Sequence, residues 1–343
     1  MALSSAIGRG HPNYLRSVLS FLPAVPEINA SGLGWTFARW LYRTGAQNQT
    51  LINAYNRLRF RTKISPLTGW LFKPKIPIKF RDYSGIFLVD HPLLAQCLAP
   101  YCRTAYLHGE IAAPSIAAVP SVWCTFVPIP FTFDTLVSLG VNPARLFISG
   151  LVIEPEIISV AKSAYELRLN RYESSSPLTV AFFTSGAYPL PHLRAIKSAA
   201  RSLQAAGHRT LIFAGTDLTH RKLLPDALFF KSHQEENQKT AALITRIDLF
   251  VAAAHERVNW AVGIGLPMFA LLPHIGPFAG ENFTFAFQQG VCLPLTHPAN
   301  FATQINHLRR TGKLTTMAKS GWGKFPIYGA ERIAQFLQNN FSC

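Results

Sequence analysis

The chain has 343 residues, of which 49% are hydrophobic and 15% are charged, so it can bury two ordinary cores and is not an intrinsically disordered protein. Its 33 Lys and Arg residues against 17 Asp and Glu residues give a net charge of +16. This excess favours an anionic partner, such as a membrane surface, a nucleic acid or a phosphorylated substrate. Glu27 is the only acidic residue in the first 81, so we expect a basic docking surface in the N-terminal part.

The cysteines and the apolar segments indicate the compartment. The five cysteines are scattered, with no CxxC pair and no His at zinc spacing, which is typical of thiols in a reducing compartment. The start of the chain lacks the charge and apolar pattern of a signal peptide. Prolines interrupt the longest uncharged run, residues 111–133, so a membrane-spanning helix is not expected there. We therefore expect a cytoplasmic protein without a metal site.

Strand-like and helical runs alternate along the chain, which predicts α/β layers. In the first half we expect a helix at residues 14–22 and strands at 86–89 and 146–153. The polar residues 170–177 indicate a linker. In the second half we expect strands at 178–183, 209–214, 247–252 and 266–272, with helices at 191–206, 257–263 and 332–339. The predicted domains are 1–168 and 169–325, followed by a closing helical segment, 326–343.

The opening turn, Gly8-Arg9-Gly10-His11, lies between a short apolar start and a helical run. A glycine turn lets a substrate approach the backbone, and the helix N-terminus that follows favours an anion. His11 stands at this point, where an imidazole could orient an acceptor hydroxyl. The alternative interpretation is a purely structural turn.

Residues 57–81 form a basic and aromatic segment without acidic residues. Aromatic rings beside Lys and Arg are typical of a membrane-surface anchor, and each basic residue near an anionic leaflet contributes about 1 kcal/mol. A solvated face and a nucleic-acid grip are the alternatives, but no recognition helix, RNP-like strand or zinc module accompanies the segment. We expect an anionic membrane partner and no nucleic acid, with contacts from Arg57, Arg59, Arg61, Lys63, Trp70 and Phe72.

Two polar groups follow apolar segments in the first half. Asp90-His91-Pro92 closes the strand expected at residues 86–89, and His108-Gly109-Glu110 follows another apolar run. The carboxyl ends of parallel strands are where α/β proteins collect ligands, so Glu110 is a candidate general base for a hydroxyl. A structural role is the alternative for each group.

The second half has four strand-end loops rich in small and polar residues. In a parallel sheet these loops open at the same edge, where backbone N–H groups and small residues can hold a diphosphate. The candidate donor-binding residues are Ser185, Gly186, Gly215, Thr216, His255, Glu256, Asn259, Glu281 and Asn282.

Taken together, these segments resemble the GT-B glycosyltransferases related to monogalactosyldiacylglycerol synthases, diacylglycerol glucosyltransferases and the peptidoglycan GlcNAc transferase. Gly8 to His11 is similar to the opening GGGH loop of that group, and residues 86–92 and 147–155 are similar to two of its strand ends. The most specific similarity is Gly265-Leu266-Pro267 with residues 275–282, against "G-L-P … I-P-G-Q-E-x-x-N".

The resemblance implies an α/β fold of two Rossmann-like domains facing a cleft. It implies an acceptor domain that faces the membrane, with Trp40 and Tyr42 in the acceptor region, and a C-terminal donor domain. Glu110 stands where the group has its catalytic aspartate. Trp260 stands where many members have a ribose-binding glutamate, and an indole with one N–H cannot replace a carboxylate, so Glu256 or Asn259 would have to take over.

The implied function is an inverting, metal-independent transfer of a sugar from a nucleoside diphosphate, with UDP expected, to a lipid hydroxyl at the inner membrane face. The nucleotide sugar is then a co-substrate, and no separate cofactor is expected. Two alternatives stay open at the level of sequence: an enzyme on a soluble acceptor, and a scaffold of the same fold without a donor site.

Overall fold

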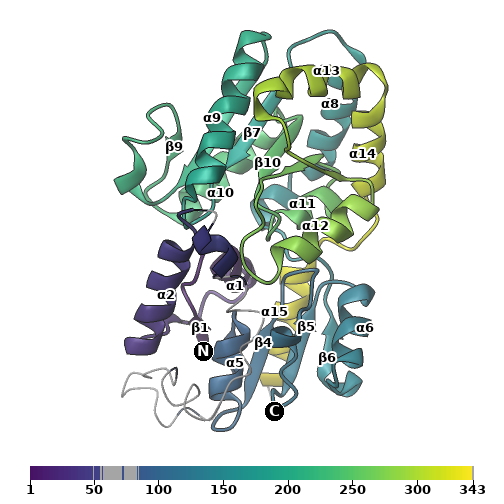
Figure 1. The fold of residues 1–343 in the computed structure, drawn as a ribbon. Coiled ribbons are helices and arrows are strands. Elements are labelled where there is room, and N and C mark those ends of the chain that lie inside the picture. Colours follow the sequence, from purple (N-terminus) through teal and green to yellow (C-terminus); the bar gives the residue numbers. More distant parts are fainter. Residues whose placement is uncertain (49, 55, 57–71, 73–82, 84, 342–343) are drawn as a thin grey trace.

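The computed structural model describes residues 1–48, 50–54, 56, 72, 83 and 85–341. Two α/β units lie one above the other, each built around a parallel sheet that helices cover (Figure 1). The N-terminal unit is the lower one in this view, and the C-terminus returns to it.

The sheet of the N-terminal unit has six strands in the order β2-β1-β3-β4-β5-β6. Its inner strands are buried along their whole length, as expected for a parallel sheet with helices on both faces. The strands are β1 (Ala2–Ser4), β2 (Glu27–Asn29), β3 (Phe87–Val89), β4 (Thr104–Leu107), β5 (Cys124–Val127) and β6 (Leu146–Ile148). The helices are α1 (Gly10–Leu19), α2 (Leu33–Gly45), α5 (Pro92–Leu98) and α6 (Pro130–Ser138).

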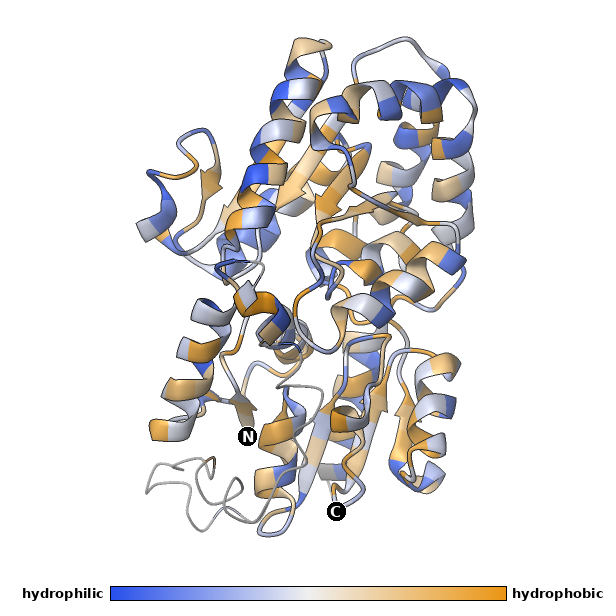
Figure 2. Ribbon diagram, in the orientation of Figure 1, coloured by the Kyte–Doolittle hydropathy of each residue, from blue (hydrophilic) through white to orange (hydrophobic). Residues whose placement is uncertain are grey.

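The sheet of the C-terminal unit also has six parallel strands, in the order β12-β11-β10-β7-β8-β9. The strands are β7 (Thr179–Phe183), β8 (Arg209–Gly215), β9 (Leu228–Phe229), β10 (Leu249–Ala252), β11 (Met268–Ala270) and β12 (Cys292–Pro294). The helices are α9 (Leu190–Ala205), α10 (His233–Ile244), α11 (Val258–Gly263), α12 (Ala279–Gln288), α13 (Phe301–Arg310) and α14 (Lys313–Gly321). Figure 2 shows apolar strands inside and polar outer faces on helices such as α9.

The passage between the units differs from the linker expected at residues 170–177. After α7 (Pro155–Ile158), helix α8 (Ala161–Glu173) runs through the expected boundary. Arg168 is fully buried and donates to the carbonyl oxygens of Ile247 and Gly265, and Arg171 pairs with Asp248 at 2.6 Å. These contacts attach α8 to the C-terminal sheet, so we propose that the boundary lies before α8.

The closing helix, α15 (Gly329–Phe341), leaves the C-terminal unit and packs on the N-terminal one (Figure 1). Its apolar face, with Ile333 and Leu337, joins the core that contains Tyr14 and Leu15 of α1. The chain therefore crosses between the units twice. Within the described residues, no helix is long and apolar enough to cross a bilayer.

We predict that Gly321→Ala destabilises the protein by about 1–3 kcal/mol through overpacking. A Cβ at Gly321 would overlap the backbone carbonyl oxygen of Ala261, where α14 crosses α11, and backbone cannot move aside cheaply. Gly280→Ala in α12 is the matched control, because nothing lies within 4 Å of the added Cβ. The control should be neutral or stabilising by up to about 1 kcal/mol, since Ala favours a helix. Urea denaturation of both variants measures the difference, and an equal effect would contradict the packing argument.

Candidate functional site

A cavity lies between the two units at the carboxyl ends of both sheets. It encloses about 710 Å³, counting the part that opens to solvent, but the centre of a water molecule can reach only about 70 Å³ of it. The passage is therefore narrow. Its walls come from the opening loop and Glu110 on one side, and from the loops after β7, β10 and β11 on the other, including Arg9, His11, Tyr42, Thr184, Ser185, His255, Glu256, Arg257 and Phe278.

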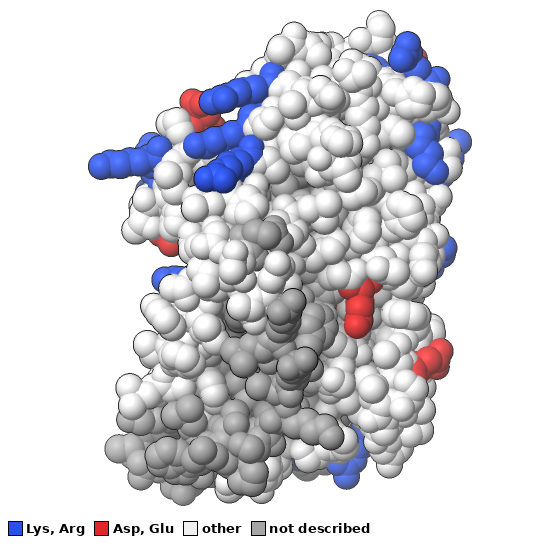
Figure 3. All heavy atoms as spheres, in the orientation of Figure 1, with Lys and Arg blue, Asp and Glu red and all other residues white. Residues whose placement is uncertain are grey.

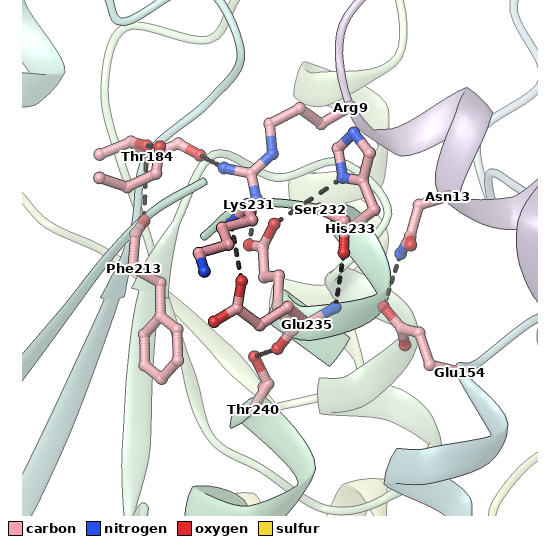
Figure 4. A network of polar contacts seen from close by, with 12 residues as sticks. Arg9, Asn13, Glu154, Thr184, Phe213, Lys231, Ser232, His233, Glu235 and Thr240 are labelled. Carbon is pink, nitrogen blue, oxygen red and sulfur yellow. Dashed lines mark hydrogen bonds and ion pairs between the residues drawn. The ribbon is translucent and has the colours of Figure 1, made fainter. Parts of the chain in front are cut away.

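Arg9 reaches from the opening loop into the C-terminal unit. Its guanidinium donates to the carbonyl oxygen of Thr184 at 3.3 Å (Figure 4). It also forms an ion pair with Glu236 of α10. Burial disfavours the charged form of Arg9, but the pKa is still raised because Glu236 outweighs that cost. The same pairing lowers the pKa of Glu236 despite its burial. Both side chains are therefore charged, and together they link the two units.

The position of the Arg9 side chain explains why glycines occupy positions 186 and 215 in two loops of the C-terminal unit. A Cβ at Gly215 would overlap the guanidinium of Arg9, and Gly215 has φ of +81°, which favours glycine. A Cβ at Gly186 would lie 3.0 Å from the Cγ of Arg9. These two glycines therefore make room for Arg9.

Glu110 is a buried carboxyl group that faces the cavity. Burial raises its pKa from 4.5 to about 8, and the nearby carboxylate of Glu256 adds to the rise. The Nδ2 of Asn282 donates to its Oε2 at 2.6 Å and partly opposes the shift. At neutral pH Glu110 is thus mostly protonated and close to the point where it exchanges its proton.

Arg257 and Glu256 are two further charged groups that line the same cavity. Arg257 pairs with Glu256, lies 3.7 Å from Glu236 and stacks over the ring of Phe183 at 4.4 Å. Sequence reasoning missed Arg257 and Glu236, because a single Arg or Glu outside a motif carries no signal of the partners that the fold brings to it. The Oγ of Ser185 is buried at the cavity wall and has no hydrogen-bond partner among the described residues, so it can serve a ligand.

The cavity brings together the predicted residues His11, Tyr42, Glu110, Ser185, Gly186, His255 and Glu256. The ring of His11 packs edge-on against His91 and Phe278, and burial lowers the pKa of His255. Gly215, Thr216, Trp40, Asn259, Glu281 and Asn282 do not line it. Glu281 is exposed in the first turn of α12.

Asn259 and Asn282, for which the sequence predicts donor binding, make hydrogen bonds within the protein. Both are buried, and both connect the two units. Asn259 donates to the carbonyl oxygens of Gly109 and Val152, while Asn282 accepts from the N–H of Ala112 at 2.8 Å. Their polar atoms are occupied by the protein, since a buried amide needs such partners.

Trp260, at the position of the expected glutamate, is also buried away from the cavity. Its Nε1 donates to the Oε2 of Glu154 at 2.8 Å, and its ring packs on Phe183 and Phe250. Glu154 in turn accepts from Asn13 of α1, so this position serves the contact between the units. Of the two proposed replacements, Glu256 alone faces the cavity.

The polar groups at the first strand ends divide into His91 and Glu110, which line the cavity, and Asp90 and His108, which are structural. Asp90 accepts from Ser4 and Ser5, and burial raises its pKa to about 6. His108 is held by Tyr106 and the carbonyl oxygen of Ala112. Neither of the two lines the cavity.

The expected membrane segment is only partly described. The carbonyl oxygen of Phe72 accepts from the indole of Trp35 at 2.8 Å, and Trp40 is 57% exposed on α2. The other predicted contact residues, Arg57, Arg59, Arg61, Lys63 and Trp70, lie outside the described residues.

A scan of protein-family models and a search of curated proteins found no match. Solved structures of similar architecture do exist. A UDP-GlcNAc 2-epimerase from Neisseria meningitidis, bound to UDP-GlcNAc, covers 99% of this chain and 100% of its own at 12% identity, with a TM-score of 0.57. The S. aureus MnaA–UDP structure covers 99% of this chain and 96% of its own at 9% identity, with a TM-score of 0.59. A UDP-GlcNAc 2-epimerase from Methanocaldococcus jannaschii, in complex with UDP-GlcNAc and UDP, covers 99% of this chain and 100% of its own. Its identity to this chain is 10% and the TM-score is 0.54.

The chain has the two-domain GT-B-type fold. The prediction of two Rossmann-like α/β domains facing a cleft is confirmed by the two parallel sheets and by these neighbours. At such low identity the similarity extends to the fold and no further. The relation to the lipid and peptidoglycan transferases stays a prediction.

We predict that Arg9 and Glu236 are strongly coupled. Arg9→Met and Glu236→Gln should each cost about 3–5 kcal/mol, because each leaves the other charge buried without its main partner. The double variant should cost less than the sum of the two, by about 1–3 kcal/mol. The exposed pair Arg16–Glu27, whose atoms lie 3.0 Å apart, is the control and should show a coupling below about 1 kcal/mol. Chemical denaturation of the single and double variants of both ion pairs measures the two coupling energies. Equal coupling energies would contradict a buried ion pair between Arg9 and Glu236.

We predict that Glu110 destabilises the protein as pH rises from about 5 to 8. Its pKa in the folded chain, about 8, lies above the usual 4.5. Its contribution to the free energy of unfolding is therefore complete below pH 4.5 and is lost as pH approaches 8. The loss is at most about 1.4 kcal/mol per pH unit. Glu110→Gln removes the titration, so its stability relative to the natural chain should increase with pH over this window. A difference that does not change with pH in chemical denaturation would show that Glu110 keeps an ordinary pKa.

Proposed function

We propose that the protein transfers a glycosyl group from a nucleoside diphosphate sugar to an acceptor hydroxyl. The observation that carries the proposal is Glu110, a buried carboxyl group of raised pKa in a cavity between two GT-B-type domains. Groups with strongly shifted pKa values in a cleft are candidates for acid–base chemistry. The GT-B-type fold of the solved UDP-sugar enzymes supports a nucleotide-sugar ligand, with UDP as the first nucleotide to test.

The proposed reaction uses Glu110 as the general base. Its carboxylate takes the proton of the acceptor hydroxyl as that oxygen forms a bond to the anomeric carbon. The bond from that carbon to the diphosphate oxygen breaks at the same time, and the nucleoside diphosphate leaves with the electron pair. Attack opposite to the leaving group inverts the anomeric centre. His11, on the same cavity wall, would orient the acceptor.

The charged groups of the opposite wall support the departure of an anion. Arg257 lies at the cavity and can stabilise the charge that develops on a diphosphate. The loop with Ser185 and Gly186 lies between β7 and the long helix α9, an arrangement that favours phosphate at a helix N-terminus. These groups supply positive charge without a metal ion. Within the described residues, no group of three or more His, Cys, Asp or Glu residues could hold a metal.

For the acceptor we propose a lipid hydroxyl at an anionic membrane surface. Helix α2 exposes Leu33, Phe37 and Trp40, and the last two rings stack with their centroids 5.7 Å apart. Tyr42 of the same helix lines the cavity, so α2 extends from an apolar exposed surface to the proposed reaction site. A peripheral location at the inner membrane face fits this arrangement.

A second candidate reaction is epimerisation of the sugar nucleotide. Glu110 and Glu256 face the same cavity and influence each other electrostatically. One carboxylate could remove a proton from the carbon next to the anomeric centre while the nucleoside diphosphate leaves with the electron pair of its bond, which forms a carbon–carbon double bond. Proton addition from the other carboxyl group to the opposite face, with return of the diphosphate oxygen to the anomeric carbon, would complete the epimerisation. Incubation in deuterated water discriminates the two, because epimerisation exchanges a carbon-bound hydrogen with solvent and simple transfer does not.

We predict that Glu110→Gln lowers sugar transfer by at least about 100-fold while nucleotide binding persists, because the amide keeps its shape but cannot take a proton. For the natural chain, log kcat/KM should rise by one unit per pH unit below about 8 and level off above it, since the ionised form is active. A rate that falls above pH 8 would assign Glu110 as an acid instead. Transfer is measured by release of the nucleoside diphosphate, with hydroxyl-bearing lipids as acceptors.

Thermal shift across nucleoside diphosphates is the control for binding. A nucleotide at about 100 times its Kd adds about 2.7 kcal/mol to stability. The natural chain and Glu110→Gln should respond equally to the same nucleotide. No response to any nucleotide in either protein would remove the transferase proposal and favour a scaffold.

A further inference from the structure

A basic surface lies on the C-terminal unit, away from the cavity. Helix α9 exposes Arg194, Lys197 and Arg201, whose spacing of three and four residues places them on one side of the helix. Figure 3 shows Lys and Arg side chains gathered at the upper left, over the position of α9 and β9 in Figure 1. A shallow hollow lies between these residues and Ser198 and Ser202.

The segment around β9 extends this surface. It packs on α9 through Leu224, which joins Leu193 in a small core, and a second hollow runs from Lys197 and Arg201 to residues 224–227. The segment exposes Arg221 and Lys222. It also exposes three leucines, with Leu218 at 56%, Leu223 at 43% and Leu228 at 37%. We name these residues and the three basic residues of α9 the α9–β9 face.

The charge of this face is one-sided. From residue 190 to 228 the acidic residues are Asp217 and Asp226, against the basic residues just named. Asp217 is engaged locally, since it accepts from both the backbone N–H and the hydroxyl of Thr219. Such a surface attracts anions, and the hollow between Arg194, Lys197 and Arg201 offers room for a phosphate group, whereas Asp226 lines the second hollow.

We propose that the α9–β9 face docks on an anionic lipid surface. Basic side chains bind the headgroups, while Leu218, Leu223 and Leu228 enter the boundary with the acyl chains, which is the pairing typical of interfacial elements. A nucleic-acid site would instead present aromatic platforms for bases. Isolated exposed leucines are common, but three beside five basic residues match a membrane interface.

The face continues toward the cavity across the gap between the units. Gln47, just past α2, donates to the carbonyl oxygen of Ala187 at 3.2 Å, and Arg43 is near enough to Asp217 to contribute to lowering its pKa. The C-terminal end of α2 therefore adjoins this face. The inference builds on the proposed lipid acceptor, because one membrane would then contact both units beside the proposed reaction site.

Co-sedimentation with vesicles tests the proposal by binding alone, so its outcome is separate from that of the transfer assay. The natural chain should sediment with vesicles of phosphatidylcholine mixed with phosphatidylglycerol, and far less with phosphatidylcholine alone. Arg194→Glu, Lys197→Glu and Arg201→Glu together should weaken binding by roughly 100-fold, since each basic residue contributes about fivefold. Changing Leu218 and Leu223 to Ser should weaken the part of the vesicle binding that the natural chain retains at high salt.

The matched control reverses Arg310, Lys313 and Lys319, which are exposed on α13 and α14 and carry the same total charge. This triple should stay within a few-fold of the natural chain, and circular dichroism should show that all variants are folded. Equal losses in both triples, or no loss in the first, would overturn the proposal. The proposal would also be overturned if the natural chain bound single-stranded oligonucleotides more tightly than vesicles and the α9 triple variant abolished the oligonucleotide binding.

Discussion

The ion pair between Arg9 and Glu236 is the constraint on which the cavity depends. A buried charge pair is tolerated only if both partners stay in place, because removal of either leaves the other desolvated. Here the partners come from different units, so the pair favours the arrangement in which the units face each other closely. It also explains why glycine occupies positions 186 and 215, which border the side chain of Arg9, and why the passage is narrow.

The chemistry of Glu110 depends on the same closure. Its pKa is raised because both units bury it, and its hydrogen-bond partner Asn282 belongs to the opposite unit. If the units separated, water would reach the carboxyl group and its pKa would return toward the usual value. Closure thus sets when Glu110 holds a proton and when it can accept one. The proposed general base and the contact between the domains are therefore parts of one system.

The sequence allowed the fold to be predicted because the signals are local. Apolar runs such as residues 178–183 and 247–252 mark buried strands, and strand-end loops of a parallel sheet open at one edge. It could not show the partners of a polar side chain. Asn259 and Asn282 lie near the strand-end loops, in α11 and α12, but they contact the backbone of the N-terminal unit. Arg257 gains its ion pairs only from neighbours that folding supplies. The polar residues 170–173 of the expected linker belong to α8, where they lie on the helix rather than in a loop.

Trp260 limits where a nucleotide can be recognised. A glutamate at this position would place a second carboxylate beside Glu154, inside a core lined by Phe183 and Phe250, and two unpaired carboxylates there would be costly. The indole instead donates its one N–H to Glu154 and keeps α1 and α11 together through Asn13. In the proposed donor site, Glu256, which lies against Gly10 of the opening loop, is then the carboxylate that would meet a ribose. A nucleoside bound there would contact both domains, so donor binding and closure would favour each other.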